Sequence, residues 1–241
     1  MIEADVEPSE VGVPMLEISE AIKTVAPVVT ALIAFLALRN WQRQDKAKRE
    51  AEFLDQLIDA VHAYLAAMPR PVTLFEIAKM GMAAHASSER AEESAGMVEG
   101  AIAYIQKHGE EHGKRLSDAL NEVRPDVVKL KTLAVKGQIF GFRDYAKCQN
   151  AVTMLAWQFD RIEAAMAVIG SPSLYWENPR VLDHLKSIMA IEVEDIQQRL
   201  ADSNVGILEF ASETYKRIYG LGWFKRRGVL SRKWWPFGHG R

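Results

Sequence analysis

The sequence predicts an all-α protein in which a single N-terminal transmembrane helix continues into a stalk, followed by a cytoplasmic helical bundle of about five or six helices. Three observations lead to this prediction. Strong helix formers are abundant, whereas sustained apolar–polar alternation and Asn-Gly hairpin turns do not occur. A fifteen-residue stretch near the N-terminus carries no charge. Hydrophobic residues make up 49% of the 241 residues, which is enough for a sizeable core.

The predicted membrane span covers residues 21–41. Residues 24–38 are uncharged, Lys23 can extend its ammonium group toward the lipid headgroups, and Trp41 supplies an interfacial aromatic ring. At 1.5 Å per residue this segment is about 31 Å long, close to the thickness of a bilayer core. A buried helix of a soluble protein is the main alternative, because fifteen uncharged residues are few for a span. A cleaved signal peptide fits less well, because the basic start and the small-x-small cleavage site are missing.

The charges on either side of this segment predict its orientation. Residues 1–20, the predicted acidic extracytoplasmic tail, carry six acids and no Lys or Arg, whereas residues 39–50 carry five bases. The positive-inside rule places the acidic side outside, so we expect a single-pass protein of the cell inner membrane with a cytoplasmic C-terminus. The membrane-interface residues predicted around the span are Lys23, Arg39, Trp41 and Arg43.

The predicted stalk helix covers residues 42–69. Five apolar residues recur in it at alternating steps of four and three: Leu54, Ile58, Val61, Leu65 and Met68. This heptad spacing is typical of a parallel coiled coil, so we predict these residues as a surface for oligomerisation. The pattern lasts only two heptads, and the alternative is that one amphipathic helix packs with this face on its own domain.

Residues 70–215 are predicted to form the cytoplasmic bundle. We expect a break at Arg70-Pro71, where proline stops the preceding helix, and a new start at Pro125. Gly109 and Gly113 can kink or split the predicted helix that ends at residue 120. The predicted elements are a short helix to residue 86, a helix to residue 120, a helix over 125–139, a turn at 140–142, a helix over 144–169, a loop at 170–179 and a last long helix to residue 219, which residues 203–206 can interrupt.

The C-terminal segment, residues 216–241, contains eight bases, no acid and several aromatic residues. Tryptophan beside Lys and Arg is typical of segments that lie at a membrane surface, so we predict a second membrane contact here. Nucleic-acid binding and packing of the tryptophans on the bundle are the two alternatives. The predicted interface residues are Trp223, Phe224, Lys225, Arg226, Arg227, Arg232, Lys233, Trp234 and Trp235.

One short motif suggests catalysis. His108-Gly109-Glu110-Glu111-His112 is similar to the H-x-x-E-H motif of inverted zinc peptidases, which places two zinc ligands on one helix face. The similarity covers five residues in a polar segment, which is better explained as a solvated helix face. The nucleotide-binding and hydrolase motifs GxGxxG, Walker A and GxSxG do not occur. Cys148, the single cysteine, excludes an internal disulfide framework and is expected to be a buried thiol.

We therefore expect a non-enzymatic protein without a metal or cofactor, which acts as an adaptor, scaffold or oligomerising effector at the cytoplasmic membrane face. Its expected partners are the lipid bilayer and either another protein or further copies of itself, rather than nucleic acid. The alternative is a membrane-perturbing toxin or phage-defence effector, because the span is short and the C-terminal segment has membrane-active composition. A zinc metallohydrolase and a membrane-associated nucleic-acid binder rank behind these two.

Overall fold

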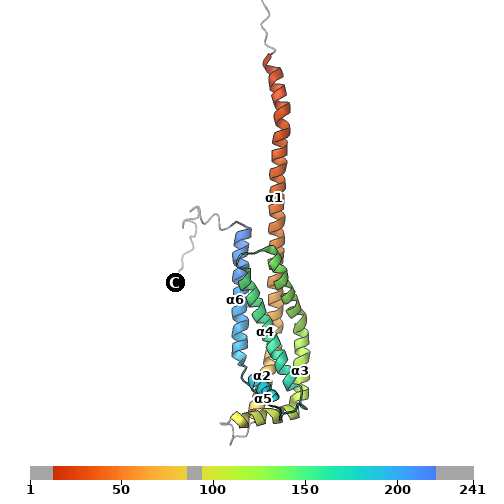
Figure 1. The fold of residues 1–241 in the computed structure, drawn as a ribbon, viewed down its shortest axis with the longest axis vertical. Coiled ribbons are helices and arrows are strands. Elements are labelled where there is room, and N and C mark those ends of the chain that lie inside the picture. The colour runs from red at the N-terminus through yellow and green to blue at the C-terminus, as the bar shows by residue number, and fades with distance from the viewer. Residues whose placement is uncertain (1–12, 86–93, 221–241) are drawn as a thin grey trace, which may run out of the picture. The chain divides into compact units, whose positions relative to one another are not determined.

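The computed structural model describes residues 13–85 and 94–220, with side chains over 25–85 and 96–220. Within these ranges the regular elements are all helical and no strand occurs, which confirms the predicted all-α class (Figure 1). The elements are α1 (Val13–Ala67), α2 (Pro69–Ala84), α3 (Ser94–Gly137), the 3-10 turn η1 (Gln138–Phe140), α4 (Tyr145–Ile169), α5 (Pro179–Met189) and α6 (Val193–Ile218).

The chain divides into two compact units, with the boundary between Arg49 and Glu50. The first unit contains the N-terminal part of α1. The second unit contains the rest of α1 together with α2 to α6. The helical bundle therefore takes in α1 from Glu50 onward, a stretch that the sequence analysis assigned to the stalk.

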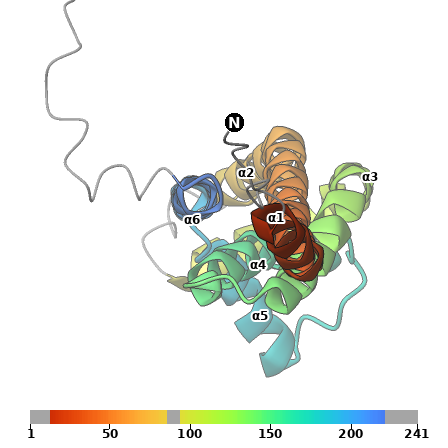
Figure 2. The same ribbon diagram turned by 90° about the horizontal axis from the view of Figure 1, so that it is seen from above.

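The helices of the second unit pack around one hydrophobic core, and Figure 2 shows α3, α4 and α6 from above. Full burial of a large apolar side chain contributes about 1.5–3 kcal/mol to stability. The hydroxyl of Tyr64 donates a hydrogen bond of 2.6 Å to the carbonyl oxygen of Leu155, so a buried polar group of α1 is satisfied by α4. Large residues with no exposed surface include Leu54, Leu57, Phe75, Leu120, Leu155 and Ile162.

The break between α1 and α2 is one residue wide. Met68 interrupts the helix, but its amide donates to Tyr64 at 3.0 Å and its carbonyl accepts from Val72 at 3.2 Å. Pro69 occupies the first turn of α2, where a missing N–H costs least. The break predicted at Arg70-Pro71 is therefore present, two residues earlier and almost without loss of helical hydrogen bonds.

Helix α3 differs from the prediction because it runs unbroken through Gly109, Gly113 and Pro125. Val123 and Val127, on either side of the proline, are both buried in the core. Their packing outweighs the hydrogen bond that the proline removes, so tertiary contacts override the local signal for a new helix.

The last predicted helix also differs, because it is divided into α5 and α6. Asn178 caps α5 by accepting a hydrogen bond of 3.0 Å from the Arg180 amide, as its position before Pro179 predicts. The chain then leaves the helix at residues 190–192, where Lys79 of α2 donates to the carbonyl oxygen of Ile191. Residues 203–206, which can interrupt a helix, lie inside α6.

Candidate membrane span and interaction surfaces

The first unit exposes an apolar segment of α1. Successive residues of a helix are about 100° apart, and every residue from Val25 to Leu38 is exposed, so apolar side chains, alanines included, lie around its whole circumference. Val28 is 68% exposed and Phe35 is 59% exposed. By length and composition this segment suffices to cross a membrane, and a signal sequence would share these properties. The exposed apolar residues are Val25, Val28, Val29, Leu32, Ile33, Phe35, Leu36, Leu38 and Trp41.

The residues predicted at the membrane interface lie at the two ends of this segment. Arg39, Trp41 and Arg43 are exposed within α1, and the backbone of Lys23 lies in the same helix. The hydroxyl of Thr30 donates to the carbonyl oxygen of Ala26 at 2.8 Å, so this polar group is satisfied within its own helix. Internal satisfaction of polar groups is what a helix in lipid requires.

The five residues predicted for oligomerisation lie in the second unit. Leu54, Val61 and Met68 are completely buried, and Ile58 and Leu65 are partly buried against the same core. Other helices of the same chain therefore cover most of this face, as in the alternative interpretation of the heptad spacing. Ile58 keeps partial exposure, and oligomerisation through these five residues stays a prediction.

An exposed groove runs along α6 and reaches α1 at Ile58, and we call it the α1–α6 groove. It consists of two adjoining hollows of about 400 Å³ and about 490 Å³. Leu208, Ser212 and Lys216 line both of them. The first hollow is also lined by Ile58, Ala211, Tyr215 and Tyr219, and the second by Val205, Glu209 and Glu213.

Carboxylates outnumber cations at the α1–α6 groove, where Lys216 is the cation among the lining residues. Asp55 accepts a hydrogen bond from the hydroxyl of Tyr215, and Asp59 is close enough to affect the same hydroxyl electrostatically. Burial is the main cause that raises the pKa of Tyr215 well above its usual value, and the hydrogen bond to Asp55 raises it further. This hydroxyl therefore stays neutral. Glu209 and Glu213 add negative charge on the α6 side.

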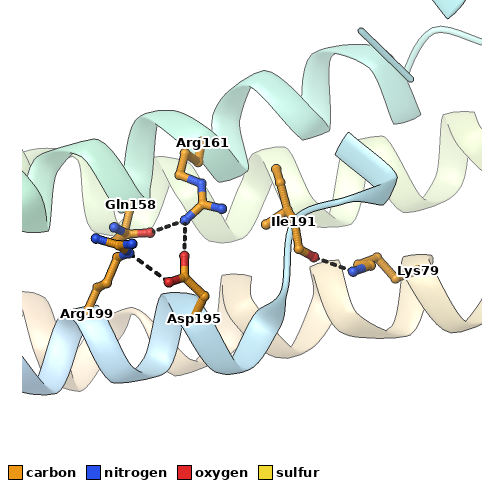
Figure 3. Close-up of polar contacts among 6 residues, drawn as sticks. All are labelled: Lys79, Gln158, Arg161, Ile191, Asp195 and Arg199. Carbon is orange, nitrogen blue, oxygen red and sulfur yellow. Dashed lines mark hydrogen bonds and ion pairs between the residues drawn. The ribbon is translucent and has the colours of Figure 1, made fainter. Parts of the chain in front are cut away.

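A second polar cluster joins α4 to α6 (Figure 3). Asp195 of α6 accepts hydrogen bonds from Arg161 at 2.9 Å and from Arg199 at 2.8 Å. These two hydrogen bonds hold the pKa of Asp195 below its usual value. The guanidinium carbons of Arg161 and Arg199 lie 4.7 Å and 5.9 Å from the ring centre of Trp157. Because its charges are paired with one another, this cluster stabilises the packing of two helices.

The histidines of the H-x-x-E-H motif pack around Tyr104. The ring centres of His108 and His112 lie 5.4 Å and 5.5 Å from that of Tyr104, and the ring of His85, which follows α2, lies 5.7 Å from that of His108. Burial is the main cause that lowers the pKa of His112, and the nearby positive charge of Arg115 lowers it further. In the part of the chain that the structure describes, no group of three His, Cys, Asp or Glu side chains could hold a metal ion.

The predicted C-terminal membrane-contact residues lie outside the described residues, which end at Gly220, so this contact stays a prediction. They are Trp223, Phe224, Lys225, Arg226, Arg227, Arg232, Lys233, Trp234 and Trp235.

The α1–α6 groove was not predicted, although the sequence of α6 contains a signal for it. Ile207 and Phe210 are buried in the core, whereas Val205, Leu208 and Tyr219 lie on a second apolar stripe with substantial exposure. A helix with apolar residues on a second face is expected to contact something other than its own core.

Comparison with known proteins gives no relative. The chain matches no protein-family model, and no similar protein is found among curated sequences or among solved structures. A function therefore has to be proposed from the chemistry and geometry of the chain itself.

Proposed function

We propose that the chain is a single-pass membrane protein whose helical bundle acts through protein contacts at the cytoplasmic membrane face. The observation that supports this most is that α1 exposes every residue from Val25 to Leu38, among them eight large apolar side chains. Each such side chain would gain about 1.5–3 kcal/mol by leaving water, and a bilayer core offers that environment along the whole segment.

The charge pattern supports the direction of insertion. Residues 1–20 are acidic, and residues 39–50 are rich in bases. This asymmetry favours a cytoplasmic bundle, and the acidic start counts against a cleaved signal sequence.

Protein contact is the task we propose for the bundle, because the α1–α6 groove offers apolar surface within a polar rim. Val205 is 53% exposed and Tyr219 is 63% exposed. An apolar patch bounded by polar residues is typical of a protein-interaction surface. Chemical crosslinking in native membranes should give adducts with a second protein or a second copy, and a bundle that forms neither contradicts this part of the proposal.

Membrane extraction tests the anchor. The wild-type protein should remain in the membrane pellet after washing with alkaline carbonate, whereas the double variant Leu32→Lys/Phe35→Lys should move to the supernatant. Each lysine at the centre of a span costs about 2.5–3.5 kcal/mol. The matched control is Val128→Lys/Val135→Lys, because these residues are 58% and 63% exposed on α3 of the bundle. Release of the wild-type protein by carbonate would contradict the anchor.

The intact mass tests whether the apolar segment is cleaved off, and protease accessibility tests the orientation. The membrane-bound protein should keep its apolar segment, so an intact mass that lacks residues 1–38 would identify a signal sequence instead. Protease added outside intact cells should remove only part of residues 1–20. Protease added to inside-out vesicles should digest the bundle, and the reverse pattern would overturn the orientation.

A further inference from the structure

We propose that residues 221–241 of this chain bind the α1–α6 groove of the same molecule, where they compete with the protein contact proposed above. Tyr219 lines the groove, and Gly220 adopts a left-handed conformation with φ of 68°. A left-handed residue after a helix turns the chain away from the helix axis. Residues 221–241 therefore start beside the groove, and this holds whether or not the protein is anchored in a membrane.

The segment is long enough to cover the groove. Along α6 the groove extends from Val205 to Tyr219, about 21 Å at 1.5 Å per residue. Trp223 is three residues beyond Gly220, so an extended chain carries it about 10 Å. Trp234 is fourteen residues beyond Gly220 and has a reach of about 46 Å. Aromatic residues at both ends of the segment can therefore enter the same groove.

The chemistry of the segment complements that of the groove. Residues 221–241 contain three tryptophans, two phenylalanines, six bases and no acid. The groove offers Ile58, Leu208 and Ala211 to apolar rings. The carboxylates at its edge outnumber Lys216, the cation among its lining residues. The rings of Tyr215 and Tyr219 lie nearly parallel, with centres 6.2 Å apart, so they provide aromatic surface for an indole or a guanidinium group.

The covalent connection favours this occupant over a second copy of the chain. A short flexible linker gives a tethered segment an effective concentration of about a millimolar, far above that of most cellular proteins. In a two-fold dimer through the groove, Glu209 and Glu213 of one copy would also lie near the same carboxylates of the other, and like charges at an interface are unfavourable.

Cysteine labelling tests the proposal in the full chain. Cys148 is buried and is first replaced by alanine, and Leu208→Cys then places a thiol in the groove. We expect a maleimide to label this thiol about tenfold more slowly in the full chain than in a chain that stops after Gly220, because the docked segment covers it. The control is Val128→Cys on α3, which should be labelled at the same rate in both chains.

Variants that keep the full length separate docking from an effect of truncation. Replacing Trp223, Phe224, Trp234 and Trp235 by serine should raise the labelling rate of Leu208→Cys toward that of the shortened chain. The double variant Glu209→Lys/Glu213→Lys should do the same, because it removes the rim charges. The labelling rate of Val128→Cys and the helix content report whether each variant is folded.

Three results would overturn the proposal. The first is an equal labelling rate of Leu208→Cys in the full and the shortened chain. The second is protection that increases with protein concentration, which would assign the groove to a second copy. The third is protection that appears only after anionic lipid vesicles are added, which would assign the segment to the membrane.

Discussion

Single glycines determine how closely α3 approaches the end of α4. A Cβ atom on Gly113 would lie 2.3 Å from the Cα atom of Gly170, and one on Gly109 would lie 2.3 Å from the carbonyl oxygen of Ile169. Both contacts are with backbone, which cannot move aside as a flexible side chain can. The two glycines, which were expected to kink or split α3, instead allow close contact between helices.

Replacing Gly113 by alanine should therefore lower the free energy of unfolding by about 1–3 kcal/mol, the usual cost of overpacking. Urea denaturation measures this change. The matched control is Gly206→Ala in α6, where the added Cβ would meet the Cβ atom of Ala151 at an ordinary 3.8 Å. Alanine should stabilise that position by up to about 1 kcal/mol through its helix propensity. Equal effects of both substitutions would contradict the close approach at Gly113.

Cys148 was expected to be a buried thiol, and the structure confirms this expectation. Burial raises the pKa of the Cys148 thiol to about 12 from its usual value of 9.0. The folded state therefore keeps the proton that the unfolded state loses above pH 9, so this group lowers stability progressively between about pH 9 and pH 12. At pH 10 the wild type should have lost about 1.4 kcal/mol relative to Cys148→Ala.

Urea denaturation of the wild type and of Cys148→Ala at pH 7 and pH 10 measures this difference. Ionisation of other groups occurs in both proteins and cancels in the comparison. A stability difference that is the same at both pH values would contradict a buried thiol at this position.

At the scale of elements, Asp195 connects α4 and α6 through Arg161. Asp195→Asn should lower the stability of the bundle at pH 7, because the two guanidinium groups favour the charged carboxylate. The pKa of Asp195 is lowered in the folded state, so its contribution is present above the usual value of 3.8 and is lost as pH falls through the folded pKa. Thermal denaturation of the two proteins should therefore converge in acid.

The matched control for this prediction is Asp202→Asn. Asp202 lies on the same helix and accepts a hydrogen bond of 2.8 Å from Gln198, four residues earlier, so its contact is local and exposed. The substitution should change the melting temperature much less than Asp195→Asn at pH 7. A similar effect of both variants would show that Asp195 does not join the two helices.

The boundaries of the elements could be predicted only where the signal is local. Asn178-Pro179 predicted the start of α5 because an N-cap and a first-turn proline act within one helical turn. Pro125 suggested a helix start that does not occur. Helix α3 continues through the proline because Val123 and Val127 are buried against distant residues, and a local pattern does not show such packing. The break at residues 190–192 is supported by Lys79, more than a hundred residues away, so no local pattern indicates it.

At the scale of the whole molecule, composition and periodicity predicted the all-α class and the apolar segment of α1, because both are properties of neighbouring residues. The heptad spacing from Leu54 to Met68 correctly indicated an apolar helix face but left its partner open. The α1–α6 groove was not predicted, because it depends on the placement of Ile58 beside residues about 150 positions later. Sequence patterns show which faces are apolar, and only the fold shows what covers them.

The division of the chain leads to a last prediction, that residues 50–241 fold without the first unit. The hydrophobic core of the second unit begins at Phe53 and ends at Ala211, so a chain that starts at Glu50 keeps all of it. This fragment should be soluble without detergent, rich in helix, and should unfold in one cooperative urea transition measured by circular dichroism.

A fragment that starts at Arg70 provides the control. It lacks the α1 residues Leu54, Leu57, Val61 and Tyr64, all completely buried, and with Tyr64 it loses the hydroxyl that donates to the carbonyl oxygen of Leu155 in α4. Loss of several such side chains costs more than the roughly 5–15 kcal/mol that stabilises a typical domain, so cooperative unfolding should disappear. If both fragments unfolded with the same midpoint, α1 beyond Glu50 would not belong to the bundle, and the original assignment of that stretch to a stalk would be the better one.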